Sequence, residues 1–283
     1  MSDAMLVWLL TSALYGDVMA QPWRPETASS AQFESHPAFD PLTGDLYFVR
    51  SSPAFSGWRI LVSRCVAGGW AEPVPAPFSG EGVEADPHFT ADGRRVWFIS
   101  SRADPPAKTS DDLDIWYAER GSDGAWRAPV RLPAPVNSPA AEWFPRSDGA
   151  GGLHFGSGRP GGFGDTDIYR AAEADGAWRV ANLGGPVSTA ADDYEFEPSR
   201  DGRFAVLMSD GTLYRLDREG EGWGPRQPIA TGAEGFHVGP TLSPSGRTLL
   251  FAARTGDRSG ELFRQAIGDA ETWPPPCATD AAP

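Results

Sequence analysis

One pattern returns five times along the chain, at intervals of roughly 50 residues. Each copy has an acidic residue or a histidine, a proline three residues later, a glycine-containing turn, short apolar runs, and a Gly-x-Trp sequence or a close variant. The prolines of the five copies are Pro37, Pro87, Pro145, Pro198 and Pro240. Such a repeat constrains the architecture more than any single residue does, because each unit must pack against its neighbours.

Short runs of aromatic and branched residues predict the strands within each copy. Leu46-Tyr-Phe48 and Val96-Trp-Phe98 are two such runs, and each follows a turn with glycine, as at Asp92-Gly93. A third run, such as Asp114-Ile-Trp116, and a fourth strand beginning at the tryptophan complete the unit. Four short strands repeated at this period are typical of a propeller blade. We therefore predict an all-β fold, a single β-propeller of four-stranded blades.

The number of copies predicts five blades. The units lie at about residues 34–80, 84–135, 142–187, 195–231 and 237–275, within a propeller domain of residues 21–283. Each copy ends at a tryptophan, and these are Trp70, Trp126, Trp178, Trp223 and Trp273. A sixth tryptophan of this kind, Trp23, precedes the first copy. Its segment is expected to close the ring as the outer strand of the blade that begins at Pro240. Six blades are the alternative, but residues 1–33 lack the repeated signals.

The chain is acidic, with 24 Lys and Arg against 38 Asp and Glu and a net charge of −14. Nucleic acids and anionic membranes bind basic faces, so we expect neither as a partner. The other explanation of the negative charge is that it keeps the protein soluble. We expect a monomer.

The first 20 residues have features of a secretory signal. Residues 5–15 are an apolar run, and Val18-Met-Ala20 resembles a cleavage site. The run is too short to span a bilayer. These features predict a periplasmic or secreted protein. Asp3 and the lack of a basic residue before the run favour the alternative, an apolar N-terminal strand or helix packed on the ring of a cytoplasmic protein.

The two cysteines, Cys65 and Cys277, lie in the first and last units, which are neighbours in a closed ring. A disulfide between them would latch the ring, and two unrelated thiols are the alternative. The sequence has no Cys-x-x-Cys motif and no histidine cluster, so we expect no structural zinc site.

The segment from Ala85 to Arg102, together with Asp114-Ile-Trp116, resembles the WD40-like repeat of TolB-type propeller proteins. Glu142-x-x-Pro145, followed by Asp167-Ile-Tyr169, is a second match, and the resemblance covers about residues 34–275. It implies a non-enzymatic, protein-binding ring in the bacterial envelope, without a cofactor. It does not name the partner, because propellers have many unrelated roles.

The acidic residue of each copy precedes the strand expected to be innermost, so these residues should meet at one mouth of the channel. They are Glu34, Glu84, Glu142, Glu195 and, in the fifth copy, His237. Such a ring would focus a negative potential on a ligand. Arg102 and Arg159 follow the second strands and should face the same mouth. They would either contribute to ligand binding or neutralise the carboxylates as ion pairs and turn caps.

Copies four and five depart from the pattern. Copy four has the short turn Ser209-Asp-Gly-Thr212, so Glu195 lacks the arginine of the other copies, and Glu197 adds a carboxylate. We therefore expect any ligand or cation near Glu195, Glu197 and His237. Oxygen-rich ligands favour calcium as the metal.

These observations favour a binding or scaffold propeller for a protein or small polar ligand. The alternative is a glycoside hydrolase or lyase that uses carboxylates at the channel mouth. Carboxylates that repeat in register favour a structural role, since enzymes place their acid and base in unlike environments. We therefore predict no catalytic residue.

Overall fold

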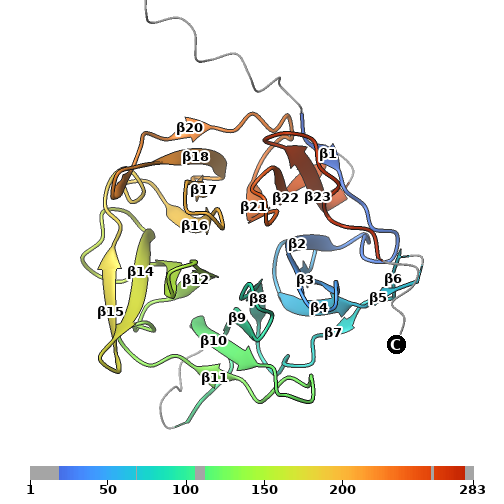
Figure 1. Ribbon diagram of the computed structural model, residues 1–283, viewed down its shortest axis with the longest axis horizontal. Helices are drawn as coiled ribbons and strands as arrows, with labels where there is room; N and C mark the ends of the chain where they lie inside the picture. The colour runs from blue at the N-terminus through green and yellow to red at the C-terminus, as the bar shows by residue number, and fades with distance from the viewer. Residues whose placement is uncertain (1–18, 68, 106–111, 256–257, 278–283) are drawn as a thin grey trace, which may run out of the picture.

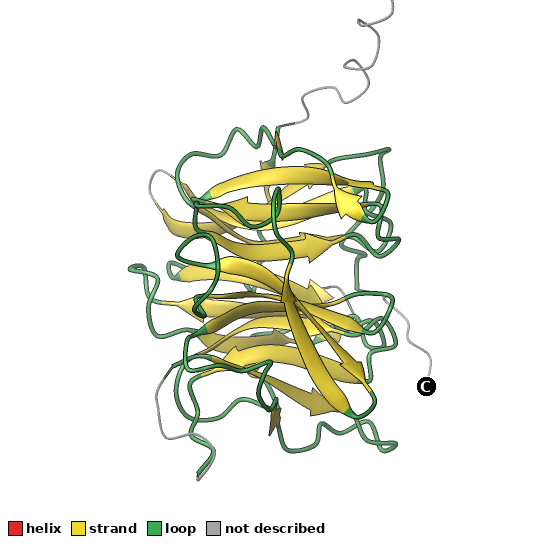
Figure 2. Cartoon of the chain, turned by 90° about the vertical axis from the view of Figure 1, so that its left-hand side faces the viewer, coloured by secondary structure: helices red, strands yellow, loops and turns green. Residues whose placement is uncertain are grey.

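The computed structural model describes residues 19–67, 69–105, 112–255 and 258–277. Five antiparallel sheets surround a central axis, which makes the molecule a five-bladed β-propeller (Figure 1). The prediction of five blades is confirmed, and the alternative of six is wrong. The described residues contain no helix (Figure 2), and hence none that could cross a membrane.

Each blade runs outward from an inner strand. Blade 1 contains β2 (Phe33–Phe39), β3 (Leu46–Ser51), β4 (Arg59–Ser63) and β7 (Val74–Pro75), with a hairpin of β5 (Cys65–Val66) and β6 (Gly69–Trp70). Blade 2 contains β8 (Glu84–Phe89), β9 (Arg95–Ser100), β10 (Asp114–Glu119) and β11 (Val130–Arg131). Blade 3 contains β12 (Glu142–Ser147), β13 (Gly152–Ser157), β14 (Asp167–Ala174) and β15 (Ala177–Asn182). Blade 4 contains β16 (Asp193–Pro198), β17 (Phe204–Ser209), β18 (Thr212–Glu219), β19 (Gly222–Trp223) and β20 (Gln227–Pro228). Blade 5 contains β21 (His237–Leu242), β22 (Thr248–Thr255), β23 (Arg258–Ala266) and β1 (Gln21–Pro22).

The inner two strands of each blade are joined by tight turns, as the glycine-containing sequences predict. Gly93 and Gly202 have φ angles of 66° and 68°, in the left-handed region that glycine enters without steric cost. Turns of this kind let neighbouring strands pair in antiparallel fashion, so the strands of blades 1 to 4 follow chain order, as do the first three strands of blade 5.

The outer strands differ from the prediction. Trp178 lies in the outer strand β15, as expected. In blades 1 and 4 the tryptophan lies instead in a two-residue hairpin strand, β6 or β19, and Trp126 forms an isolated bridge with Arg120. The paired outer strand then follows a few residues later, as β7 does after Trp70.

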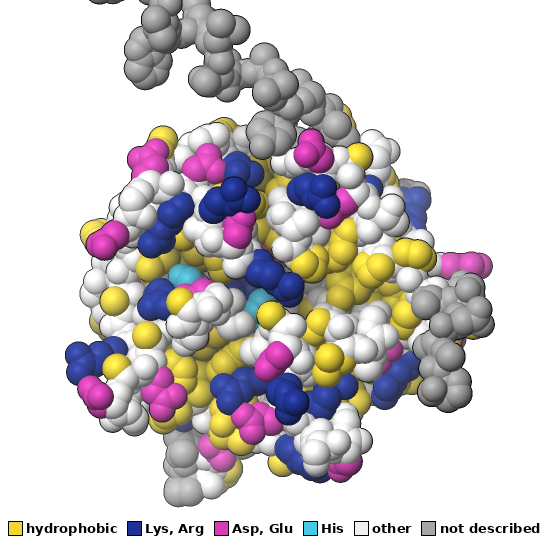
Figure 3. Space-filling model, viewed as in Figure 1, with side chains coloured by type: hydrophobic (Ala, Val, Ile, Leu, Met, Phe, Trp, Pro, Cys, Tyr) yellow, Lys and Arg dark blue, Asp and Glu magenta, His cyan; other side chains and the backbone are white. Residues whose placement is uncertain are grey.

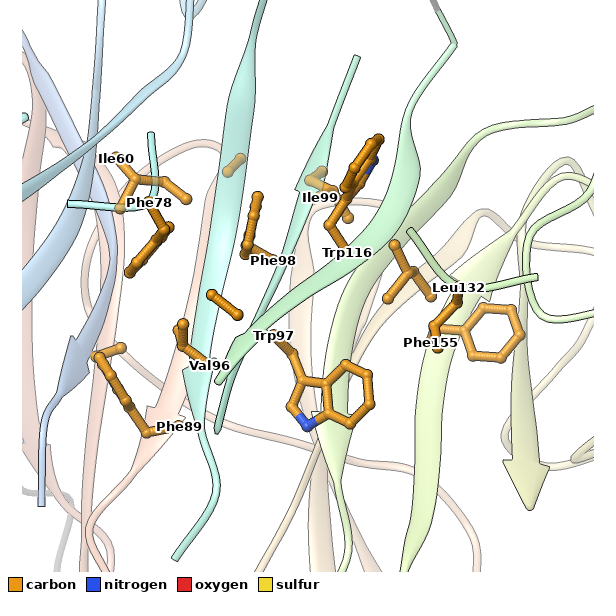
Figure 4. Packing of buried hydrophobic residues seen from close by; sticks show 14 of the residues in the cluster. Ile60, Phe78, Phe89, Val96, Trp97, Phe98, Ile99, Trp116, Leu132 and Phe155 are labelled. Carbon is orange, nitrogen blue, oxygen red and sulfur yellow. The ribbon is translucent and has the colours of Figure 1, made fainter. Parts of the chain in front are cut away.

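The hydrophobic core lies between adjacent blades. Phe98 of blade 2 packs on Phe78 with ring centroids 5.1 Å apart, and Phe78 stacks on Tyr47 of blade 1 at 5.8 Å (Figure 4). These rings are at most 2% exposed, and burial of each contributes about 1.5–3 kcal/mol. The aromatic second strands therefore stabilise the contact between blades as well as each blade.

Both ends of the chain take part in closing the ring. β1 pairs with β23 of blade 5, and the Trp23 N–H donates to the Leu262 carbonyl at 2.7 Å. Cys277 follows blade 5 and is paired as a disulfide with Cys65 of blade 1, with Cα atoms 5.3 Å apart. The sequence prediction of a signal peptide at residues 1–20 falls almost wholly outside the described residues.

Candidate functional site at the channel mouth

Four buried carboxylates occupy equivalent positions at the start of inner strands. Each accepts a hydrogen bond from the backbone N–H four residues earlier, and each pairs with an arginine. The four pairs are Glu34 with Arg50, Glu84 with Arg102, Glu142 with Arg159 and Asp193 with Arg226. All four carboxylates are at most 1% exposed. They are therefore turn caps held by ion pairs, as the structural alternative in the sequence analysis stated.

The carboxyl group of Glu142 has a raised pKa. Burial raises its pKa to about 7, against the hydrogen bonds from Ser138 and the positive charge of Arg159. This carboxylate also accepts hydrogen bonds from hydroxyl groups, among them Ser157 Oγ at 3.0 Å. This carboxyl consequently changes charge near neutral pH while it stays inside the framework.

In blade 4 the equivalent of Glu142 is Asp193, two residues before Glu195, so the predicted position of Glu195 in the ring is wrong. Asp193 pairs with Ser209 across the sheet, as Glu142 does with Ser157. In the other inner strands two residues, for example Phe144 and Pro145, lie opposite one residue of the second strand, whereas β16 has a single unpaired residue, Tyr194. Pro198 lies five residues after Asp193, whereas Pro145 lies three residues after Glu142, so alignment on the prolines shifts the acidic position by two residues.

Blade 4 also has the arginine that the prediction missed. Arg226, from the outer part of the blade, binds Asp193, the Ser209 hydroxyl and the carbonyls of Pro186 and Val187. Arg159 makes the same set of contacts in blade 3, with Glu142, Ser157 and two carbonyls. The arginine of blade 4 thus occupies the same place as Arg159, although it comes from the loop before β20 instead of the loop after the second strand.

The structure does not bring Glu195, Glu197 and His237 into one site. His237 bonds to the Thr231 hydroxyl at 2.9 Å and to the Gly211 carbonyl at 3.1 Å, and burial lowers its pKa. Glu197 pairs with Arg146 at 2.6 Å. Among the described residues no group of three or more His, Cys, Asp and Glu side chains could hold a metal ion.

Glu195 belongs instead to a buried network at the centre of the ring. Its Oε1 lies 3.0 Å from His36 Nε2, and Asp86 Oδ1 lies 3.1 Å from the same nitrogen. Burial alone would lower the pKa of His36, but the Asp86 and Glu195 carboxylates outweigh it and raise the pKa. His36 therefore joins blades 1, 2 and 4.

The remaining oxygens of the Glu195 and Asp86 carboxylates accept hydrogen bonds from backbone N–H groups. Glu195 Oε2 accepts from the Gly239 N–H at 2.8 Å, and Asp86 Oδ2 accepts from the Phe144 N–H at 2.8 Å. His36, Asp86 and Phe144 have φ angles of 50°, 59° and 50°, left-handed conformations within the bulges. The bulges thus turn side chains and N–H groups toward each other across the channel.

Above this network lies a cavity of about 630 Å³, which we call the mouth pocket. His36, Asp86 and Glu195 form its floor. Its aromatic wall contains Phe55, Trp58, Trp143 and Phe236. Its acidic wall contains Asp192 and Asp210, with Thr166 and Tyr194. The two walls meet where Phe236 lies beside Gly211. All five blades contribute to it. A volume of this size suits a small-molecule ligand or one or two side chains of a partner.

Asp192 and Asp210 are brought together by the short turn of copy four. The Asp192 N–H donates to Asp210 Oδ1 at 3.2 Å, and the Asp210 N–H donates to the Asp192 carbonyl at 3.1 Å. Sequence reasoning identified this short turn but not Asp192, which has no counterpart in the repeat. A short turn beside two acidic residues was the available signal.

The opposite end of the channel has a different character. A cavity of about 580 Å³ there is lined by the far ends of the inner strands, including His88, Pro198 and Arg200. Arg200 also lines a neighbouring cavity with Arg170 and Arg218. Figure 3 views one face of the ring and shows Lys and Arg side chains around its middle.

The chain matches no protein-family profile and no curated protein sequence. Solved structures share its fold. TolB of Acinetobacter baumannii superposes with a TM-score of 0.55 and 18% identity over 85% of this chain, which spans only 56% of that protein. A protein of Agrobacterium tumefaciens assigned to TolB gives 0.53 and 17% over 86% of this chain and 80% of its own. An α-L-arabinofuranosidase of Lactobacillus brevis gives 0.53 and 14% over 86% and 92%. The chain therefore shares the β-propeller fold with TolB proteins and with an enzyme.

Proposed function

We propose that the protein is a non-enzymatic binding propeller of the bacterial cell envelope, and that its small ligand or protein partner enters the mouth pocket. The observation that supports binding over catalysis is that the carboxylates at the floor of the pocket already have partners. All four oxygens of Asp86 and Glu195 already contact His36 or a backbone N–H. Carboxylates committed in this way are poorly placed to act as a glycosidase acid and nucleophile.

The envelope location is supported by the signal-like run at residues 5–15 and by the TolB-like repeat. N-terminal sequencing of protein recovered from the periplasm or medium tests it. We expect a mature chain beginning at Gln21. A chain that keeps residues 1–20 and stays in the cytoplasm would contradict export.

Binding is tested by pull-down from an envelope extract of the source organism, with the chain from Gln21 onward as bait. We expect a specific partner that is lost with Trp58→Ala and Phe236→Ala, which remove pocket wall. Leu42→Ala is the matched control, since Leu42 is 60% exposed at the β2–β3 turn and outside the mouth pocket.

Two results would overturn the proposal. One is capture that the wall variants leave unchanged. The other is turnover of aryl glycosides or polysaccharides by the wild type that disappears in Glu142→Gln or Glu195→Gln. Calcium binding stays a prediction without a site among the described residues, and calorimetry with calcium chloride tests it.

A further inference from the structure

The acidic wall of the mouth pocket has no cationic partner among the residues that the structure describes. Asp192 and Asp210 have no ion pair within the described residues, and Asp192 Oδ1 is a buried atom without a hydrogen-bond partner there. The neighbouring Asp193, by contrast, is paired with Arg226 at 2.7 Å. Of the described residues, no Lys or Arg lines the pocket, and the basic side chain that does, His36, is held by Asp86 and Glu195. The pocket therefore has negative charge that the described residues do not neutralise.

The aromatic wall is a continuous row of rings. Phe236 lies 5.8 Å from Phe55, Phe55 lies 5.4 Å from Trp58, and Trp58 lies 5.9 Å from Trp143, between ring centroids. The row crosses from blade 5 through blade 1 to blade 3. Phe236 is 38% exposed, so the row is open to a ligand.

Elsewhere the protein covers its rings with arginine. Guanidinium groups lie over rings in blades 1 to 4, for example Arg50 over Phe48 at 5.4 Å and Arg159 over Phe155 at 5.0 Å. Within the described residues no such contact involves Phe55, Trp58, Trp143 or Phe236. No guanidinium group of the described residues thus competes for these four rings, and a cation over an aromatic face contributes about 0.5–2 kcal/mol.

We infer that the mouth pocket binds an organic cation, with its ammonium or guanidinium group at Asp192 and Asp210 and its apolar part along the aromatic row. This inference rests on the proposed function and names the ligand class. Two sources share this chemistry, the basic side chain of a partner protein and a free amine. A bare ammonium would leave most of the 630 Å³ unfilled, so the cation must be carried on a larger frame.

The test uses pairs of probes that differ in charge alone. One pair is an end-blocked tripeptide with central arginine and its citrulline analogue. The other is phenylethylammonium and 2-phenylethanol. Binding is followed by calorimetry and by the intrinsic tryptophan fluorescence, to which Trp58 and Trp143 contribute. We expect the charged member of at least one pair to bind about tenfold tighter than its neutral analogue, and the pair that binds identifies the source.

Asp192→Asn and Asp210→Asn should each remove most of that preference and leave the neutral probe unaffected. Asn tolerates the left-handed φ of 46° at Asp210, so the turn should persist. Asp201→Asn, at an exposed turn outside the pocket, is the control. Unchanged thermal unfolding confirms that the variants are folded.

Equal binding within both pairs, or a charge preference that survives both Asn variants, would overturn the inference. Calcium that binds these aspartates and displaces no charged probe would also count against it. Suppose that a partner is captured from extract and lost with Phe236→Ala but is not displaced by the arginine peptide. The proposed function would then stand and the ligand class would be wrong.

Discussion

At the residue scale, His36 shows how the ring keeps two acidic side chains in its centre. Asp86 and Glu195 approach the same imidazole nitrogen from different blades, and all three side chains are buried. A buried carboxylate without a partner is costly, so the three groups stabilise the fold only as a set.

His36→Asn tests this dependence. Asparagine suits the φ of 50° but carries no charge, so both carboxylates lose their shared partner. We expect the free energy of unfolding to fall by about 3–5 kcal/mol, measured in urea by tryptophan fluorescence. Adding Glu195→Gln should recover part of the loss. A single variant within about 1 kcal/mol of wild type would show that the network does not need the imidazole.

Glu142 predicts a pH dependence. Its pKa is about 7 in the folded chain against an ordinary 4.5, so the folded state holds the proton to higher pH than the unfolded state. The stability that this proton contributes is complete below about pH 4.5 and disappears as the pH rises through about 7. Glu142→Gln is permanently neutral. The variant should therefore gain stability relative to wild type by at least about 1 kcal/mol between pH 5 and pH 8. Urea unfolding at both pH values measures the difference, and a constant difference would contradict the shift.

At the element scale, blade 4 keeps the same contacts between carboxylate, serine and arginine as blade 3, although its sequence departs from the repeat. The bulge of β16 has one unpaired residue, whereas the bulges of the other inner strands place two residues opposite one. The arginine that binds its cap follows β19. Asp193 nevertheless keeps the cap, the cross-strand serine and the arginine of its counterparts. The cap at Asp193 is therefore a structural feature that blades 1 to 4 share, whereas the turn at Asp210 is specific to blade 4.

We expect Arg226→Met to cost about as much as Arg159→Met, roughly 3 kcal/mol each, because both leave a fully buried carboxylate unpaired. Arg203→Met is the control. Arg203 is 84% exposed beside Asp201, where an ion pair contributes at most about 1 kcal/mol. Chemical unfolding of the three variants decides between these roles. If Arg226→Met costs no more than Arg203→Met, the equivalence of the two caps is wrong.

The same blade marks the limit of prediction from the sequence. The three inner strands of each blade, the glycine turns and the five blades follow from local patterns that each copy contains, whereas the outer strands of blades 1, 2 and 4 do not. The acidic caps follow too where the proline spacing is constant, as at Glu34, Glu84 and Glu142. Glu195 was misplaced because a β-bulge depends on pairing with the next strand, which the spacing to Pro198 does not encode. Arg226 and Asp192 were missed because non-local packing, rather than the repeat, defines their roles.

At the scale of the whole molecule, the two chain ends cross the seam between blades 5 and 1 in opposite directions. β1 adds the outer strand of blade 5, and the segment after β23 returns to blade 1, where Trp273 packs on Phe39 at 5.2 Å (Figure 1). Trp23 lies 5.6 Å from Trp70 at the same seam. The repeat thus has six closing tryptophans for five blades, because Trp23 and Trp273, one near each end of the chain, both contribute to the closure.

The disulfide is the covalent part of this closure and gives the last prediction. Cys65 and Cys277 are 212 residues apart in sequence, so a bond between them restricts the unfolded chain strongly. Replacing both with serine should lower the free energy of unfolding by about 2–4 kcal/mol. Reductant should lower the wild type to the level of the variant and leave the variant unchanged. Non-reducing peptide mapping of the exported protein provides the direct check. If both thiols are free, the non-covalent contacts of β1 and Trp273 must close the ring alone, and deleting residues 19–24 should then open it.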